Sequence, residues 1–192
     1  KGSSKTPGSL WCKGNEAWQA YAGPGISTIH VSRWDEVYGL GSGGKLLKYE
    51  PATRKWDQVE KGRPVKGLQV DCAGNLYDIS GAKIMRKVGI AAWTSIGLPE
   101  ADETGAKFKV AQFDLGQPTD LWLVDSAGRV LRFERKTHKA IAVTTPTKFA
   151  KVSVGCQGDV WGLDTDKTLY HYVPQTGQWT VKGNKISDVE AG

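Results

Sequence analysis

Short alternating runs of apolar residues, separated by Gly-rich polar turns, recur along this chain. The clearest example includes residues 152–154, 160–163 and 169–172, where large apolar residues are interspersed with small or polar ones. Alternation with a period of two is typical of strands with one buried face. No stretch keeps a helical period for more than about three turns. The pattern therefore predicts an all-β chain of short antiparallel strands.

The same unit repeats along the whole chain. Each unit holds four candidate strands, and a Trp marks the fourth strand in most units. A fixed position ahead of the second strand recurs at intervals of about 40 residues, at Asp35, Gly74, Thr119, Gly158 and Gly192. A period of this length is typical of the four-stranded blades of a β-propeller.

The two ends of the chain match parts of one unit. Residues 186–192 match a first strand, whereas residues 9–12 and 17–21 match a third and a fourth strand. Residues 1–5 would supply the second strand, although they carry no apolar side chain. We therefore predict a single domain over residues 1–192. It is a five-bladed β-propeller of four-stranded antiparallel blades, closed by pairing of the N- and C-terminal strands in one blade, which removes exposed edges.

Composition and charge agree with this class of fold. The 192 residues include 24 Gly, eight Trp and one Met, which suits short strands and tight turns. No apolar run approaches the roughly 18 residues of a membrane-spanning helix, so no membrane span is expected. The net charge of +6 favours a solvated surface, with attraction of anionic lipid, glycan or nucleic acid as the alternative. No nucleic-acid-binding motif is present, so no nucleic acid partner is expected.

The three cysteines are Cys12, Cys72 and Cys156. Cys72 and Cys156 occupy the same position in two units, which places them in equivalent loops two units apart. We expect that separation to exceed the roughly 6 Å between Cα atoms that a disulfide requires. The sequence therefore predicts free thiols, which are typical of a reducing compartment.

Catalytic and metal-binding patterns are weak. The three His residues fall in different units, and no Cys or His cluster has the spacing of metal ligands. A propeller glycosidase would need two carboxylates about 5–9 Å apart, and Asp78, Asp125 and Asp164 recur too regularly to single out such a pair. We expect no enzyme activity, no cofactor and no metal site.

The unit resembles the tectonin repeat. The resemblance lies in six residues that stand in the expected order and spacing: Gly158, Trp161, Asp164, Tyr170, Gly177 and Trp179. Weaker copies cover nearly the whole chain, with departures such as Ala140 in place of a fourth-strand Trp. The family includes horseshoe-crab tachylectins, fish-egg lectins, and slime-mould and fungal tectonins.

This resemblance implies a non-enzymatic lectin with a role in innate immunity. It implies repeated shallow sites for surface glycans, such as bacterial lipopolysaccharide or methylated or N-acetylated sugars, with avidity supplied by repetition. Glycans, including acidic or phosphorylated ones, are the expected partners. Whether the chain forms oligomers or joins a larger assembly stays open. The alternative is an intracellular tectonin domain that acts as a protein- or lipid-interaction module. The resemblance favours an extracellular or cell-surface location, whereas the expected free thiols favour the interior of the cell.

Sugar recognition needs aromatic faces for pyranose rings and polar groups for their hydroxyls. The aromatic candidates recur in fourth strands, where packing between blades is the alternative role: Trp18, Trp56, Trp93 and Trp179. Polar candidates follow the repeated Gly position, where turn capping is the alternative: Asn75, Asp120 and Asp159. Trp34 breaks the repeat in a loop beside Arg33 and Asp35, which makes these three residues candidates for a contact particular to this protein.

Overall fold

The computed structural model describes residues 10–13, 18–21, 25–31, 36–59, 61–80 and 83–191, with the backbone alone for 10–13 and 18–21. Its regular elements are β-strands and one short 3-10 turn. The chain forms two compact units, Lys1–Leu68 and Gln69–Gly192, which are described one at a time. The all-β prediction is therefore confirmed.

The first unit contains one four-stranded antiparallel sheet, here called blade 1. Its order is β3 (Thr28–Val31), β4 (Val37–Gly41), β5 (Lys45–Glu50) and β6 (Lys55–Gln58). The turn η1 (Ser42–Gly44) joins the middle strands, with Gly43 at a φ of 72°. A separate two-stranded sheet pairs β1 (Leu10–Lys13) with β2 (Trp18–Tyr21).

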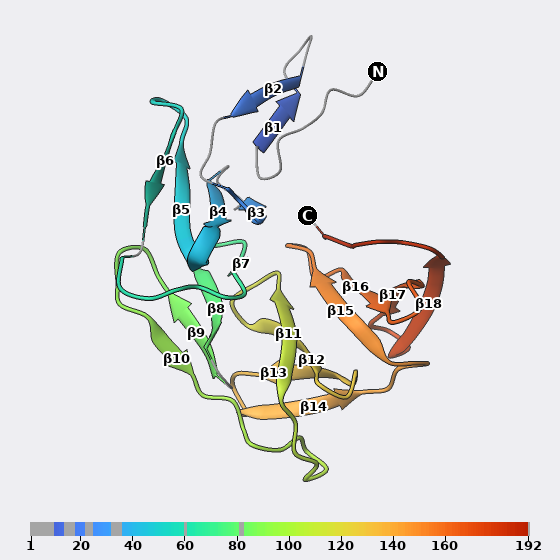
Figure 1. Cartoon of the computed structure of the whole chain (residues 1–192). Helices are drawn as coiled ribbons and strands as arrows, with labels where there is room; N and C mark the ends of the chain where they lie inside the picture. Colours follow the sequence, from blue (N-terminus) through green and yellow to red (C-terminus); the bar gives the residue numbers. More distant parts are fainter. Residues whose placement is uncertain are drawn as a thin grey trace. The chain divides into compact units, whose positions relative to one another are not determined.

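The second unit contains three more sheets of four antiparallel strands each (Figure 1). Blade 2 is formed by β7 (Gln69–Val70), β8 (Leu76–Ser80), β9 (Lys83–Lys87) and β10 (Thr94–Ile96). Blade 3 is formed by β11 (Val110–Leu115), β12 (Asp120–Asp125), β13 (Val130–Glu134) and β14 (Lys139–Val143). Blade 4 is formed by β15 (Phe149–Val154), β16 (Val160–Asp164), β17 (Leu169–Val173) and β18 (Gln178–Gly183).

The prediction of five blades closed by the termini is wrong, because the described strands form four blades. The predicted third and fourth strands at the N-terminus exist, but β1 and β2 pair only with each other among the described strands. Residues 184–191 form no strand. They run back towards β15 (Figure 1) and are held there by side chains, through ion pairs from Lys151 to Asp188 and Glu190.

Side chains also join blade 3 to blade 4. The Gln112 amide pairs with Val152 as a strand backbone would, since its Nε2 donates to the Val152 carbonyl and its Oε1 accepts from the Val152 N–H. Asp114 Oδ2 accepts from the Ser153 hydroxyl and from the Val154 N–H, each at 2.9 Å. Burial raises the pKa of Asp114 to about 6. The first strands of blades 3 and 4 are therefore joined by polar side chains, of which Asp114 and Ser153 are buried.

Two equivalent Trp–Gly pairs show why Gly stands in the second strand of a blade. Trp56 packs over Gly39 and Trp179 packs over Gly162, so closely that a Cβ on either Gly would lie 2.9–3.0 Å from the indole ring. Trp179 also lies 4.7 Å from the ring centroid of Phe149. Each of these tryptophans lies on the fourth strand and reaches across the face of its own blade to the second strand. Its role there is packing.

An Asp residue closes the same kind of turn four times in the second unit. In each case one carboxylate oxygen accepts the backbone N–H groups two and four residues further on, at 2.8–3.0 Å. The four residues are Asp71, Asp102, Asp125 and Asp164. Two of the carboxylates weighed for a glycosidase, Asp125 and Asp164, thus serve as turn caps.

The prediction of free thiols is wrong for Cys72 and Cys156, which form a disulfide with Cα atoms 5.6 Å apart. The loops between first and second strands meet within the second unit, since the Cys72 N–H donates to the Gly116 carbonyl and Gln117 Nε2 donates to the Cys156 carbonyl. The loop of blade 3 therefore contacts the loops of both blade 2 and blade 4. Counting units along the chain overestimated the distance, because equivalent loops of these blades converge in space.

Candidate functional site

A pocket of about 460 Å³ lies between the end of blade 2 and the start of blade 3. We call it the lysine pocket, because three exposed lysines line it: Lys83, Lys107 and Lys109. Apolar side chains line the rest of it, namely Ile96, Leu98, Pro99, Phe108 and Val110. Glu100 is the single carboxylate among the lining residues. The pocket therefore combines an apolar lining with an excess of positive charge.

The segment that carries two of these lysines is anchored through its backbone. Arg129 Nη2 donates to the Lys107 carbonyl at 3.0 Å, and the Ser126 N–H donates to the Lys109 carbonyl at 2.9 Å. Phe108 between them packs against the core of the second unit. The backbone of residues 107–109 is thus fixed while both ammonium groups stay in solvent.

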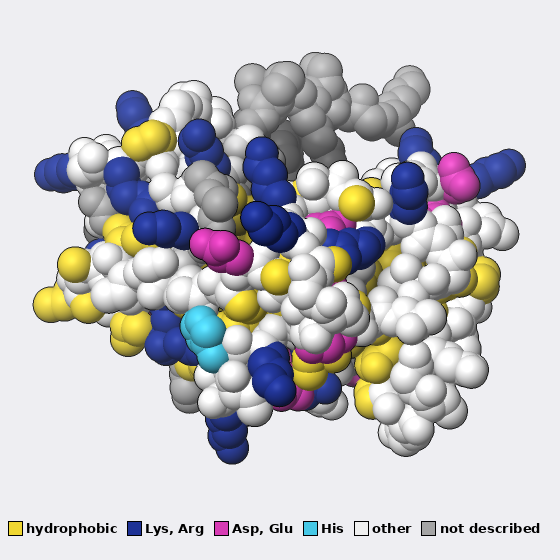
Figure 2. Space-filling view, turned by 90° about the horizontal axis from the view of Figure 1, so that it is seen from below, with side chains coloured by type: hydrophobic (Ala, Val, Ile, Leu, Met, Phe, Trp, Pro, Cys, Tyr) yellow, Lys and Arg dark blue, Asp and Glu magenta, His cyan; other side chains and the backbone are white. Residues whose placement is uncertain are grey.

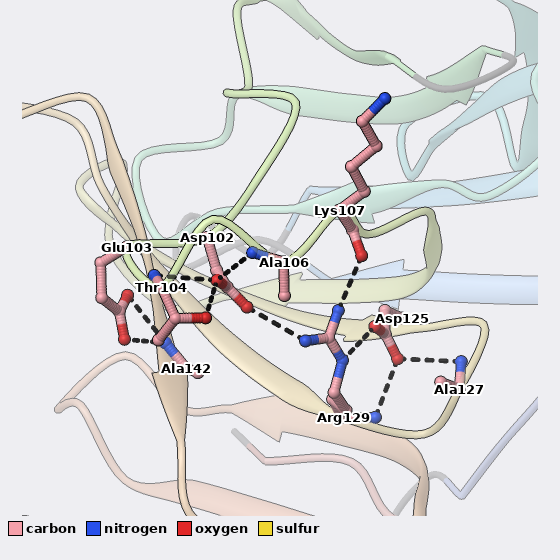
Figure 3. A network of polar contacts seen from close by, with 9 residues as sticks. All are labelled: Asp102, Glu103, Thr104, Ala106, Lys107, Asp125, Ala127, Arg129 and Ala142. Atoms are coloured by element: carbon pink, nitrogen blue, oxygen red, sulfur yellow. Dashed lines mark hydrogen bonds and ion pairs between the residues drawn. The ribbon is translucent and has the colours of Figure 1, made fainter.

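A network of polar contacts includes residues 102–107, at the end of the inserted stretch and just after it (Figure 3). Arg129 donates to Asp102 Oδ2 at 3.0 Å and to Asp125 Oδ2 at 2.8 Å, and both carboxylates are buried. The Thr104 hydroxyl and backbone N–H groups that bond to Asp102 lower the pKa of its carboxyl group, so it stays ionised and keeps its ion pair. Figure 3 shows the Lys107 ammonium pointing away from this network, and no described residue pairs with it.

The charge around the lysine pocket is not balanced locally. No described residue forms a hydrogen bond or ion pair with the side chain of Lys83, Lys107 or Lys109. A second, shallower hollow of about 510 Å³ shares Lys107, Phe108 and Lys109 with the pocket and continues towards Arg129. Lys and Arg side chains also predominate over Asp and Glu on the face shown in Figure 2. An anionic ligand is therefore the kind that this surface attracts.

One wall of the pocket comes from an edge strand. β10 is the outermost strand of blade 2 and contributes Ser95 and Ile96 to the lining. Among the described strands only β9 pairs with it, so the outward backbone groups of β10 have no strand partner. Such an edge can bind an extended polypeptide by main-chain hydrogen bonds.

Two of the four tryptophans predicted to bind sugar are placed for packing. Trp56 and Trp179 pack within their blades as described above, and both are partly buried. Trp93 lies just before β10 and is also partly buried. Trp18 lies in β2, and its side chain is outside the described part of the structure. Arg33, Trp34 and Asp35 lie outside the described residues altogether, so the prediction of a contact there stays a prediction.

The three predicted polar residues differ in their surroundings. The Asn75 side chain donates to Asp71 and is buried. Asp120 accepts a hydrogen bond from the indole Nε1 of Trp122 at 2.9 Å. Asp159 is the exposed member, and its carboxylate lies 3.6 Å from His171 Nε2. Among the described residues of the second unit, none of the predicted site residues lines the lysine pocket.

Sequence reasoning did not find Lys83, Lys107 and Lys109. These lysines do not form a run, and Lys83 lies about 25 residues from the other two. One usable signal was present, because residues 99–105 interrupt the repeat as an insertion and Lys107 and Lys109 follow it directly. An insertion that breaks a repeat often carries a function specific to the protein.

Within the described residues, no group of three or more His, Cys, Asp or Glu side chains could hold a metal ion. The same part of the chain contains no helix with the length and apolar character needed to cross a membrane.

Comparison with known proteins identifies the fold but no family. No protein-family model matches the chain, and no curated protein matches it. A solved structure of YCF48 bound to a D1 peptide is 17% identical with a TM-score of 0.62, over 82% of this chain and 55% of that chain. YCF48 from Cyanidioschyzon merolae is 15% identical with a TM-score of 0.52, over 84% of this chain and 57% of that chain.

A further match is PorZ, an essential bacterial surface component of the type-IX secretion system of Porphyromonas gingivalis. It is 14% identical with a TM-score of 0.54, over 82% of this chain and 21% of that chain. This chain therefore spans just over half the length of the two YCF48 chains and a smaller share of PorZ. Identities this low show the fold alone, which is an all-β β-propeller, here with four described blades.

Proposed function

We propose that this chain is a non-catalytic binding domain that holds an acidic, partly apolar polypeptide segment in the lysine pocket. The observation that carries the proposal is the set of three unpaired lysines around an apolar lining. Alternate residues of an extended peptide could place carboxylates against Lys107 and Lys109 and apolar side chains against Leu98 and Phe108. The edge strand β10 could pair with the peptide backbone.

The side chains that line this pocket favour a polypeptide ligand over a sugar. Aliphatic side chains and Phe108 form the lining, and no Trp or Tyr offers a flat face for a pyranose ring. The structurally similar YCF48 has been solved with a bound D1 peptide, so a protein of this fold can bind a polypeptide. That likeness supports a peptide ligand here without identifying one.

Reversing two charges of the pocket is expected to weaken peptide binding by about 100-fold, because each charged contact contributes roughly a factor of ten. The variant carries Lys107→Glu and Lys109→Glu. Binding is measured by fluorescence anisotropy with labelled peptides in which Glu alternates with Leu, and affinity should fall as salt is added. Lys182→Glu makes the control, because Lys182 is also an exposed lysine and lies on β18, away from the residues that line the pocket. Equal affinity of the double variant and the control variant would refute the proposed site.

Glycan recognition remains a second candidate, and blade 4 offers a specific place for it. Trp161 and His171 lie with ring centroids 4.6 Å apart, beside the exposed carboxylate of Asp159. Partly exposed aromatic rings next to a carboxylate match the needs of a sugar site. Trp161 also belongs to the set of residues that resembles the tectonin repeat.

Trp161→Ala is therefore expected to abolish any glycan-array signal that the wild-type chain gives, because sugar stacking requires the ring. Lys107→Glu with Lys109→Glu should leave that signal unchanged. An array with no signal for the wild-type chain, together with salt-sensitive peptide binding, would discard the lectin candidate and keep the peptide proposal.

A further inference from the structure

The turn between β9 and β10 exposes apolar side chains to solvent. Ile90 at its tip is fully exposed, Val88 is about half exposed, and Ala91 and Ala92 are exposed as well. No charged residue occurs from Val88 to Pro99. An exposed run of this kind at the tip of a hairpin favours contact with another apolar phase.

This tip departs from the repeat. The hairpins at the same position of the other blades are residues 51–54, 135–138 and 174–177, and all three carry polar or charged side chains. Only blade 2 among the described blades replaces them with apolar ones. The apolar tip is thus not required by the blade architecture.

The backbone of the tip is held in place by internal hydrogen bonds. The Ala91 N–H donates to the Val88 carbonyl at 3.0 Å, and Gly89 adopts a φ of 52° that closes the turn. Lys87 is buried, and its ammonium donates to the Ala91 carbonyl at 2.7 Å. Both polar groups of Ala91 are therefore satisfied without water. This lowers the penalty for moving the tip into a nonpolar medium.

We propose that the tip formed by residues 88–92 inserts into the surface of a phospholipid bilayer with anionic headgroups. The tip supplies the apolar contact, and Trp93 at its base is a residue type that favours the headgroup region. The net charge of +6 complements an anionic surface and adds long-range attraction. A bilayer accommodates a convex apolar tip directly, whereas a protein partner would need a matching hollow.

The test is co-sedimentation with vesicles of phosphatidylcholine and phosphatidylglycerol, compared with vesicles of phosphatidylcholine alone. Wild-type chain should bind the anionic vesicles, more weakly as salt is added. Ile90→Ser should reduce this binding about tenfold or more, because it removes the most exposed apolar side chain. Val181→Ser is the matched control, since Val181 is 58% exposed on β18 and should not contribute.

Two results would overturn the proposal. One is wild-type chain that fails to bind either vesicle, and the other is equal binding by the Ile90 and Val181 variants. Sedimentation equilibrium of the same variants tests whether the tip instead contacts a second copy of the chain. If Ile90→Ser dissociates an oligomer and leaves vesicle binding unchanged, the tip is a self-association surface and not a membrane contact. In the chain that carries Lys107→Glu and Lys109→Glu, Ile90→Ser should still lower vesicle binding by the same factor as in the wild-type chain, which separates the two sites.

Discussion

Replacing Cys72 and Cys156 together by Ser is expected to lower the free energy of unfolding by about 4–5 kcal/mol. The disulfide joins loops 84 residues apart in the sequence and so restricts the unfolded chain strongly. It also joins the loops of blades 2 and 4, and the Gly116 carbonyl of the blade 3 loop accepts the Cys72 N–H. Among the described residues, no other covalent bond links these blades except the chain itself.

Urea denaturation with and without a thiol reductant measures this effect. Reductant should shift the unfolding midpoint of the wild-type chain down to that of the double Ser variant. The same reductant should leave the variant unchanged, which controls for effects of the reagent on the rest of the protein. A variant as stable as the oxidised wild-type chain would show that the bond does not constrain unfolding.

Gly116→Ala is expected to destabilise the second unit by about 3 kcal/mol or more. A Cβ at this position would lie 2.1 Å from the Gly155 carbonyl oxygen and 2.8 Å from its carbon. Both are backbone atoms, so no side-chain rotation can relieve the overlap. Blades 3 and 4 would have to move apart, which disturbs the bonds that Asp114 makes to Ser153 and Val154.

Gly183→Ala is the control for this substitution. A Cβ there would meet only the Ile186 side chain at 3.7 Å or more, which is an ordinary contact. Thermal or urea unfolding should therefore separate the two variants clearly. Equal stability of the two variants would show that the junction between blades 3 and 4 yields more easily than its geometry indicates.

Much of the fold could be predicted from the sequence because the strands alternate regularly. The predicted strand at residues 160–163 is β16 (Val160–Asp164), and that at 169–172 is β17 (Leu169–Val173). Turn residues and apolar periods act within a few neighbours, so a local pattern specifies them well. The blade number was harder, because residues 186–192 match the pattern of a first strand, whereas residues 184–191 form no strand and are held by Lys151 and Ser153.

The lysine pocket could not be predicted because it depends on contacts between blades. Lys83 reaches it from the second-to-third hairpin of blade 2, whereas Lys107 and Lys109 come from the segment that enters blade 3. The disulfide escaped prediction for the same reason, since it depends on loops that converge in space. Of the predicted polar residues, Asn75 and Asp120 bond to groups within their own blades, so the alternative of a local structural role describes them well.

The Asp-closed turns have a consequence for how the number of blades in such a chain can change during evolution. Each turn satisfies its backbone with a carboxylate from within the same five residues and does not require another blade. The carboxylate bonds within such a turn are therefore independent of the number of blades present. Duplication or loss of a unit keeps them in every remaining Asp-closed turn, whereas the contacts between blades, such as those of Gln112 with Val152 and of Cys72 with Gly116, have to be rebuilt. Variation in blade number then depends on a few junction residues.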